Sequence, residues 1–186
     1  MQYNRRKFIK TLVVTAGAVM TSNLVGCNNS SDEADVEVLP VQPDTIVGSQ
    51  FFPQSVVSGD PKPDSVILWT RVEDGIGTDL ALTLQVAIDE SFSQLVVEQE
   101  FTVLAAADHC LKIRVTELNA GQHYYYRFVY QKDGTNYLSK NGRTKTATSI
   151  DSDTKVKFAY VSCQDYIGRY YNTYLSVLDN DDLDFV

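Results

Sequence analysis

Seven short apolar runs, separated by turn residues, follow one another between residues 51 and 150 and constrain the fold more than any other feature. They cover residues 54–58, 65–72, 80–88, 94–103, 111–118, 123–131 and 136–146. The turns between them contain Gly59-Asp60-Pro61, Asp74-Gly75, Asn119-Ala120-Gly121 and Asp133-Gly134. Such residues favour tight turns, and the apolar and polar residues of several runs alternate, as in strands with one buried face. The sequence therefore predicts a mostly β domain over 51–150, a fibronectin-III/Ig-like β-sandwich.

Two aromatic positions refine this prediction. Trp69, the single tryptophan, lies in the middle of the second run, and we expect it to fill the core. The segment from Leu118 to Tyr124 resembles the turn into a tyrosine corner, in which a Tyr hydroxyl bonds back to the preceding loop. We interpret Tyr124 and the two tyrosines after it as packing residues of the sandwich.

The charge balance excludes one class of partner. The 186 residues include 16 basic and 24 acidic side chains, a net charge of −8. Nucleic-acid-binding proteins carry basic patches, so we expect no nucleic-acid partner. An acidic surface also repels a phosphate ester unless a metal ion inverts the local field.

Residues 1–27 have the composition of a targeting signal. Arg5 and Arg6 precede an apolar run from Leu12 to Met20, an order that resembles a twin-arginine signal read by the twin-arginine translocase. An ordinary secretory signal with a basic start is the alternative. A membrane-spanning helix is disfavoured because the apolar run is shorter than the ~20 residues that a span needs.

Cys27 ends this signal directly after Gly26, in a segment that resembles a lipobox. Lipidation of its thiol would anchor the mature chain to a membrane without spanning it. A plain signal peptide with an incidental cysteine remains the alternative. Residues 28–50 are polar or interrupted by proline, and we expect a flexible tether there. The predicted location is therefore outside the cytoplasm, in the periplasm or at the cell surface.

A different pattern begins at residue 155. Phe158 to Val161 form a short apolar run that ends at the polar residues Ser162, Cys163, Gln164 and Asp165. A helix-like segment follows over 170–178, and a second apolar run over 183–186. Strand, helix and strand in this order predict the first βαβ unit of an α/β domain over 155–186. Ligands in such domains bind at the carboxyl ends of the strands, where Cys163 lies.

Two blocks carry a resemblance to a known family. They read FPQSVVSGDPKPDSVILWTR over 52–71 and FAYVSCQ over 158–164, with 170–186 following the second. The chain resembles PhoD-like alkaline phosphatases/phosphodiesterases, which join an N-terminal β domain to a calcineurin-like metallophosphatase domain. The resemblance implies an exported phosphoric ester hydrolase that acts on phosphate esters with a centre of iron and calcium. It also implies that Cys163 is an iron ligand.

The resemblance further implies that most ligands and the catalytic residues come from motifs beyond Val186. We therefore expect the 186-residue chain to be a truncated, inactive N-terminal part, with 155–186 fraying or packing loosely on the sandwich. Two alternatives stay open for the whole chain: a non-catalytic lipid-anchored β-sandwich interaction module and a purple-acid-phosphatase-like enzyme. The twin-arginine signal and the Ser162-Cys163-Gln164 motif argue against the latter.

Individual residues also have simpler interpretations. Cys163 is alternatively a buried structural thiol or the disulfide partner of Cys110, which exported proteins permit. His109 and His123 lack the spacing of metal ligands, so we expect structural or surface roles. The acidic residues of 179–184 do not match a calcium-binding EF-hand loop, and we interpret them as a solvated helix end.

Overall fold

The computed structural model describes residues 44–186, except 166, 169 and 181. The predicted export signal, Cys27 and most of the predicted tether lie outside these residues. No helix in the described part is long and apolar enough to span a membrane.

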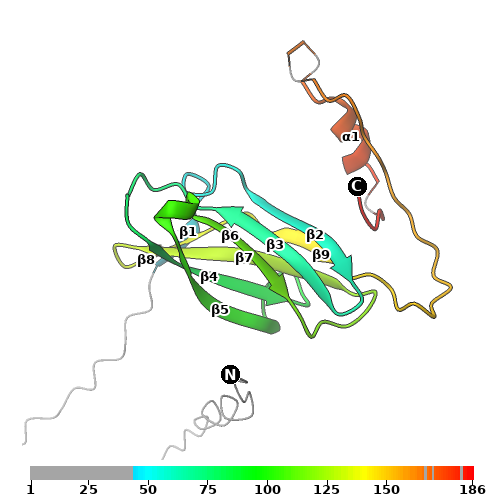
Figure 1. The fold of residues 1–186 in the computed structure, drawn as a ribbon, viewed down its shortest axis with the longest axis horizontal. Coiled ribbons are helices and arrows are strands. Elements are labelled where there is room, and N and C mark those ends of the chain that lie inside the picture. The colour runs from blue at the N-terminus through cyan, green and yellow to red at the C-terminus, as the bar shows by residue number, and fades with distance from the viewer. Residues whose placement is uncertain (1–43, 166, 169, 181) are drawn as a thin grey trace, which may run out of the picture. The chain divides into compact units, whose positions relative to one another are not determined.

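Strands dominate the described residues, as predicted (Figure 1). The strands are β1 (Asp44–Val47), β2 (Val56–Lys62), β3 (Ser65–Arg71), β4 (Leu80–Ala87), β5 (Leu95–Val103), β6 (Cys110–Val115), β7 (His123–Lys132), β8 (Thr135–Leu138) and β9 (Gly142–Lys145). A 3₁₀ turn, η3 (Ala105–Ala107), and one α-helix, α1 (Thr173–Leu178), complete the set.

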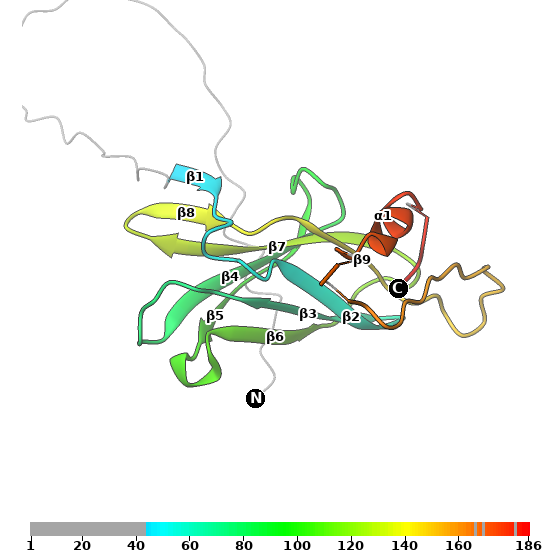
Figure 2. The same cartoon turned by 90° about the horizontal axis from the view of Figure 1, so that it is seen from above.

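The strands form two sheets, seen from two directions in Figures 1 and 2. One has the order β1-β8-β7-β4-β5, with β9 also paired to β7, and the other has the order β2-β3-β6. All pairings are antiparallel except β1 with β8. The ten-residue strand β7 pairs with β9 at its start and with β8 at its end.

The core lies between the sheets and follows the period of two in each strand. Leu82 and Leu84 of β4 and Phe128 of β7 are fully buried against Leu68 of β3. Fully burying one such side chain stabilises the fold by about 1.5–3 kcal/mol. The predicted mostly β fold with a fibronectin-III-like sandwich is confirmed.

The predicted tyrosine corner is also present. The hydroxyl of the buried Tyr124 accepts a hydrogen bond of 2.8 Å from the backbone N–H of Asn119. Tyr126 is buried in the same core, whereas Tyr125 between them is half-buried. The interpretation as packing residues is confirmed for Tyr124 and Tyr126, whereas Tyr125 lies on the opposite face of β7.

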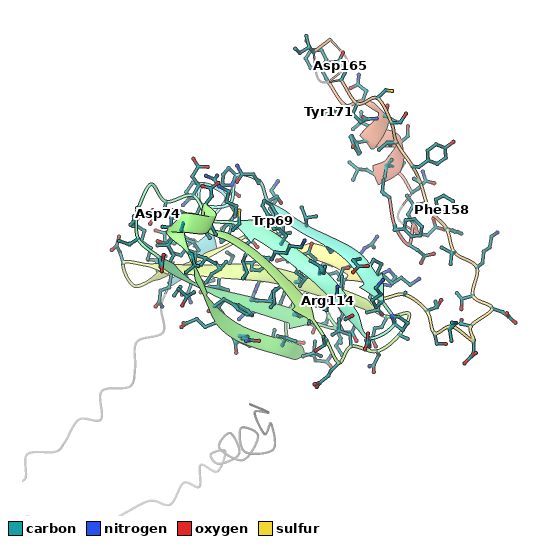
Figure 3. The ribbon with its side chains drawn as sticks, viewed as in Figure 1. Trp69, Asp74, Arg114, Phe158, Asp165 and Tyr171 are labelled. Atoms are coloured by element: carbon teal, nitrogen blue, oxygen red, sulfur yellow. The ribbon has the colours of Figure 1, made fainter. Side chains whose placement is uncertain are left out.

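Trp69 is not a core residue, and that prediction was wrong. Val66, Leu68 and Thr70 point inward from β3, so the odd-numbered Trp69 lies on the opposite face, half-buried (Figure 3). Side chains alternate strictly along a strand, so only one of two neighbours can enter the core.

The strand boundaries differ from prediction in three places. The run 136–146 is divided into β8 and β9 at Ser139, whose hydroxyl accepts a hydrogen bond of 2.9 Å from the N–H of Phe128. Gly59-Asp60-Pro61 is not a turn but an irregularity within β2, and Asp60 has a φ of 47° there. Residues 44–47, expected in the tether, form β1 because they add to the free edge of β8.

Candidate functional site

The C-terminal segment from Lys157 to Val186 has the predicted order but little regular structure. Phe158 and Phe185 form a single parallel bridge, and α1 lies between them in sequence. Ala159 donates a backbone hydrogen bond of 3.2 Å to the carbonyl of Phe185. The helix begins at Thr173 rather than at Tyr170, because Tyr170 and Tyr171 adopt positive φ angles of 55° and 56°.

Cys163 lies in the loop that follows this first bridge. Its side chain is exposed, and its backbone has a φ of 53°. Two local hydrogen bonds shape the loop: the Gln164 amide donates to the carbonyl of Ser162 at 3.1 Å, and Asp165 accepts from the N–H of Ile167 at 3.0 Å. Figure 3 shows Asp165 and Tyr171 at the end of the segment away from Phe158.

The loop and the start of α1 line a concavity of about 470 Å³. Its lining consists of Ser162, Cys163, Gln164, Asp165, Gly168, Tyr171, Asn172 and Thr173. The donors that line it are therefore one thiol, one carboxylate, and amide and hydroxyl groups. Thiolate is a ligand that suits iron, and carboxylate suits calcium.

This donor set does not make a metal site alone. Among the described residues, no group of three or more His, Cys, Asp or Glu side chains lies close enough together to hold a metal ion. Protein metal sites generally take three or four protein ligands. Cys163 and Asp165 therefore do not fit iron or calcium without further ligands.

The other candidate residues have structural places. Cys110 and Cys163 are both free thiols, half-buried and exposed respectively, so the disulfide alternative is not realised and Cys163 is not a buried structural thiol. His109 is buried, and its Nε2 lies 2.8 Å from the carbonyl oxygen of Thr78, which confirms a structural role. His123 is exposed at the start of β7.

The interpretation of the acidic residues after α1 as a solvated helix end was wrong for Asp184, whereas Asp179 and Asp182 are exposed. Asp182 forms an exposed ion pair with Lys157. Asp184 is ion-paired with Lys145 of β9, and its second carboxylate oxygen accepts the N–H of Lys157 at 2.8 Å. The hydrogen bond from Lys145, together with that from Lys157, holds the pKa of Asp184 below its ordinary value.

A second concavity, of about 570 Å³, lies beside this ion pair. It is lined by residues of β2, by His123, by β9 and by the chain after Ser176.

The rings of Phe158 and Phe185 stack with centroids 5.2 Å apart. Many apolar side chains of this segment are nevertheless strongly exposed, including Tyr160, Ile167 and Leu178, which agrees with the expected loose packing.

The chain is similar to several known proteins. A family model described as PhoD-like phosphatase, N-terminal domain, matches residues 40–148. Alkaline phosphatase D of Bacillus subtilis (strain 168) is 31% identical over 180 residues, covering 92% of this chain and 29% of that protein. A solved structure of PhoD has 29% identity and a TM-score of 0.64, covering 78% of this chain and 27% of that chain. A human fibronectin type III domain has 15% identity and a TM-score of 0.42, covering 70% of this chain and 100% of that domain. The chain thus spans less than a third of the length of its PhoD relatives.

Proposed function

Because the chain belongs to the PhoD-like phosphatases, through the N-terminal domain at residues 40–148, we propose that it is the N-terminal part of a longer enzyme that hydrolyses phosphate esters. The extent of the similarity to alkaline phosphatase D carries this proposal. The alignment covers 92% of the 186 residues, more than residues 1–148 can supply. It therefore includes part of the segment that holds Cys163.

In this proposal, Cys163 is one ligand of a metal centre that contains iron and calcium. Its thiol is exposed, free of any disulfide, and lines the concavity of the 162–173 loop. A thiolate is a ligand that iron accepts well, and a bound metal keeps a thiol deprotonated. The remaining ligands would come from other parts of the longer enzyme.

We also propose that residues 1–27 direct export by the twin-arginine translocase and that Cys27 carries a lipid. The supporting pattern is Arg5-Arg6 ahead of an apolar run that ends at Gly26-Cys27. The enzyme would then act in the periplasm or at the cell surface, held to a membrane by its lipid.

The proposed activity is tested on the longer enzyme that contains this chain. Purified enzyme is assayed with p-nitrophenyl phosphate, a monoester, and bis(p-nitrophenyl) phosphate, a diester, before and after exhaustive chelation. We expect hydrolysis of at least one ester, loss of most activity on chelation, and recovery when iron and calcium are returned. An enzyme that hydrolyses neither ester and contains no metal would favour the non-catalytic interaction module instead.

A further inference from the structure

Asp184 joins three parts of the described chain. Its backbone N–H donates to the carbonyl of Lys157 at 2.7 Å, and one carboxylate oxygen accepts the N–H of Lys157 at 2.8 Å. The other carboxylate oxygen accepts the ammonium group of Lys145. One side chain therefore connects the last residue of β9 with both ends of the segment that contains Cys163.

The Lys145–Asp184 pair is more sheltered from water than the neighbouring ion pairs. Its side chains are 22% and 19% exposed, whereas those of Lys62 and Asp60 are 54% and 45% exposed. Exposed pairs contribute little because water and salt screen them. Removing one partner of a partly sheltered pair has a larger effect, because water screens the remaining charge less completely than at an exposed site.

Lys145 is held in place by the sandwich. It ends β9, where it is paired in register with His123 of β7. At the start of β9, Gly142 allows close approach to β7: a Cβ there would lie 2.3 Å from Cζ of the buried Tyr126. The ammonium group of Lys145 thus extends from a strand that packs tightly on the core.

The Lys145–Asp184 ion pair is a small contact between β9 and the C-terminal segment, with open space beside it. Two concavities, of about 570 Å³ and about 230 Å³, both have Lys145, Asp184 and Phe185 in their linings. Space therefore lies on two sides of the ion pair rather than a continuous apolar interface. The position of the segment then depends on a small number of polar contacts.

We propose that Lys145 and Asp184 form a latch by which the β-sandwich fixes the segment that leads to Cys163. Lys157, which Asp184 binds through its backbone, lies six positions before Cys163 in the sequence. Asp184 and Lys145 are then positioning residues, and the sandwich is the frame that orients this segment. The latch itself is independent of the phosphatase activity; only its importance for a metal ligand rests on the proposed function.

Amide hydrogen exchange of the 186-residue chain, followed by NMR, tests the latch. The reporters are the amides of Ala159 and Asp184, which donate to Phe185 and Lys157. We expect each of Lys145→Met and Asp184→Asn to accelerate their exchange about tenfold. Asn can still accept the N–H of Lys157, so the second variant removes only the charge. The double variant should exchange no faster than either single one, because both changes break the same interaction.

The control is Lys62→Met, which removes an exposed ion pair of the same sandwich and should leave both reporter amides unchanged. Lys145→Arg should retain protection, and core amides of β7 serve as the internal measure of folding in every variant. Unchanged reporter exchange in Lys145→Met, or equal acceleration in Lys62→Met, would overturn the latch. Because no ester is hydrolysed in this experiment, its failure leaves the proposed function standing, and the reverse also holds.

Discussion

Asp74, in the loop after β3, is an almost fully buried acidic side chain that is ion-paired with Lys132 of β7. Its side chain is 2% exposed and accepts a hydrogen bond of 2.5 Å from the hydroxyl of Tyr130 and another from the ammonium group of Lys132. Burial by itself would raise the pKa of Asp74, but the hydrogen bonds from Lys132 and Tyr130 outweigh it and hold the pKa below the ordinary value. Burial, reinforced by Asp74, raises the pKa of Tyr130. The carboxylate therefore ties the loop after β3 to the end of β7.

Replacing Asp74 by Asn should lower the free energy of unfolding by about 2 kcal/mol at neutral pH, since charge-assisted hydrogen bonds are lost. A depressed folded-state pKa contributes stability above the unfolded value of 3.8, and this is lost as pH falls through the folded value. The difference between wild type and Asp74→Asn should therefore shrink below about pH 4. Urea unfolding across a pH series measures this difference.

Asp133→Asn is the control, because Asp133 is exposed in the β7–β8 turn with a φ of 50° that Asn also tolerates. Its effect should stay within about 0.5 kcal/mol at every pH. If the difference in the free energy of unfolding between wild type and Asp74→Asn stays constant down to acid pH, the assigned role of the carboxylate is contradicted.

At the scale of elements, α1 contrasts with the strands of the sandwich. It has six residues, and the side chain of Asn172 makes no capping hydrogen bond at its start. Helices shorter than ~12 residues are marginal in water without tertiary packing. Leu175 within α1 is 62% exposed, so packing contributes little.

The same substitution on two elements tests this contrast. Leu175→Ala should change the free energy of unfolding by less than about 0.5 kcal/mol. Leu84→Ala on β4, where the side chain is 0% exposed, should cost about 3 kcal/mol because it leaves a cavity in the core. Thermal and urea unfolding of the two variants provide the comparison, and similar losses in both would show that α1 is packed far better than its exposure indicates.

The sequence predicted the elements well wherever one face of a strand is buried. Alternation along β4 and β6 indicates their inward faces directly, and the turn before Tyr124 identified the tyrosine corner. Trp69 was misplaced because large size does not decide which face of a strand a residue occupies. β1 was missed because its pairing depends on the free edge of β8, which is a tertiary property.

The candidate site was predictable only in part, for a similar reason. Local sequence identified the loop that contains Cys163, because it follows an apolar run. In the structure the Cys163 side chain is exposed. Asp184 was assigned to solvent because its partners, Lys145 and Lys157, lie 39 and 27 residues away. No local period or spacing signals a contact over such a separation.

At the scale of the whole molecule, the described chain combines a well-packed sandwich with a sparsely packed segment. The fully buried residues belong to the sandwich, whereas the segment after Lys157 exposes many of its apolar side chains. This asymmetry agrees with the proposed function, in which the segment with Cys163 would contribute to a larger phosphatase domain. The role of the Cys163 thiol is central to the proposed function.

Metal analysis of the longer enzyme, wild type against Cys163→Ser with Cys110→Ser as the matched control, tests this claim. Both thiols are free, but Cys110 lies at the start of β6. We expect Cys163→Ser to lose most of its iron and its ester hydrolysis, because a neutral hydroxyl is a poor ligand for iron, while Cys110→Ser keeps both. Iron content and activity equal to wild type in Cys163→Ser would contradict the account.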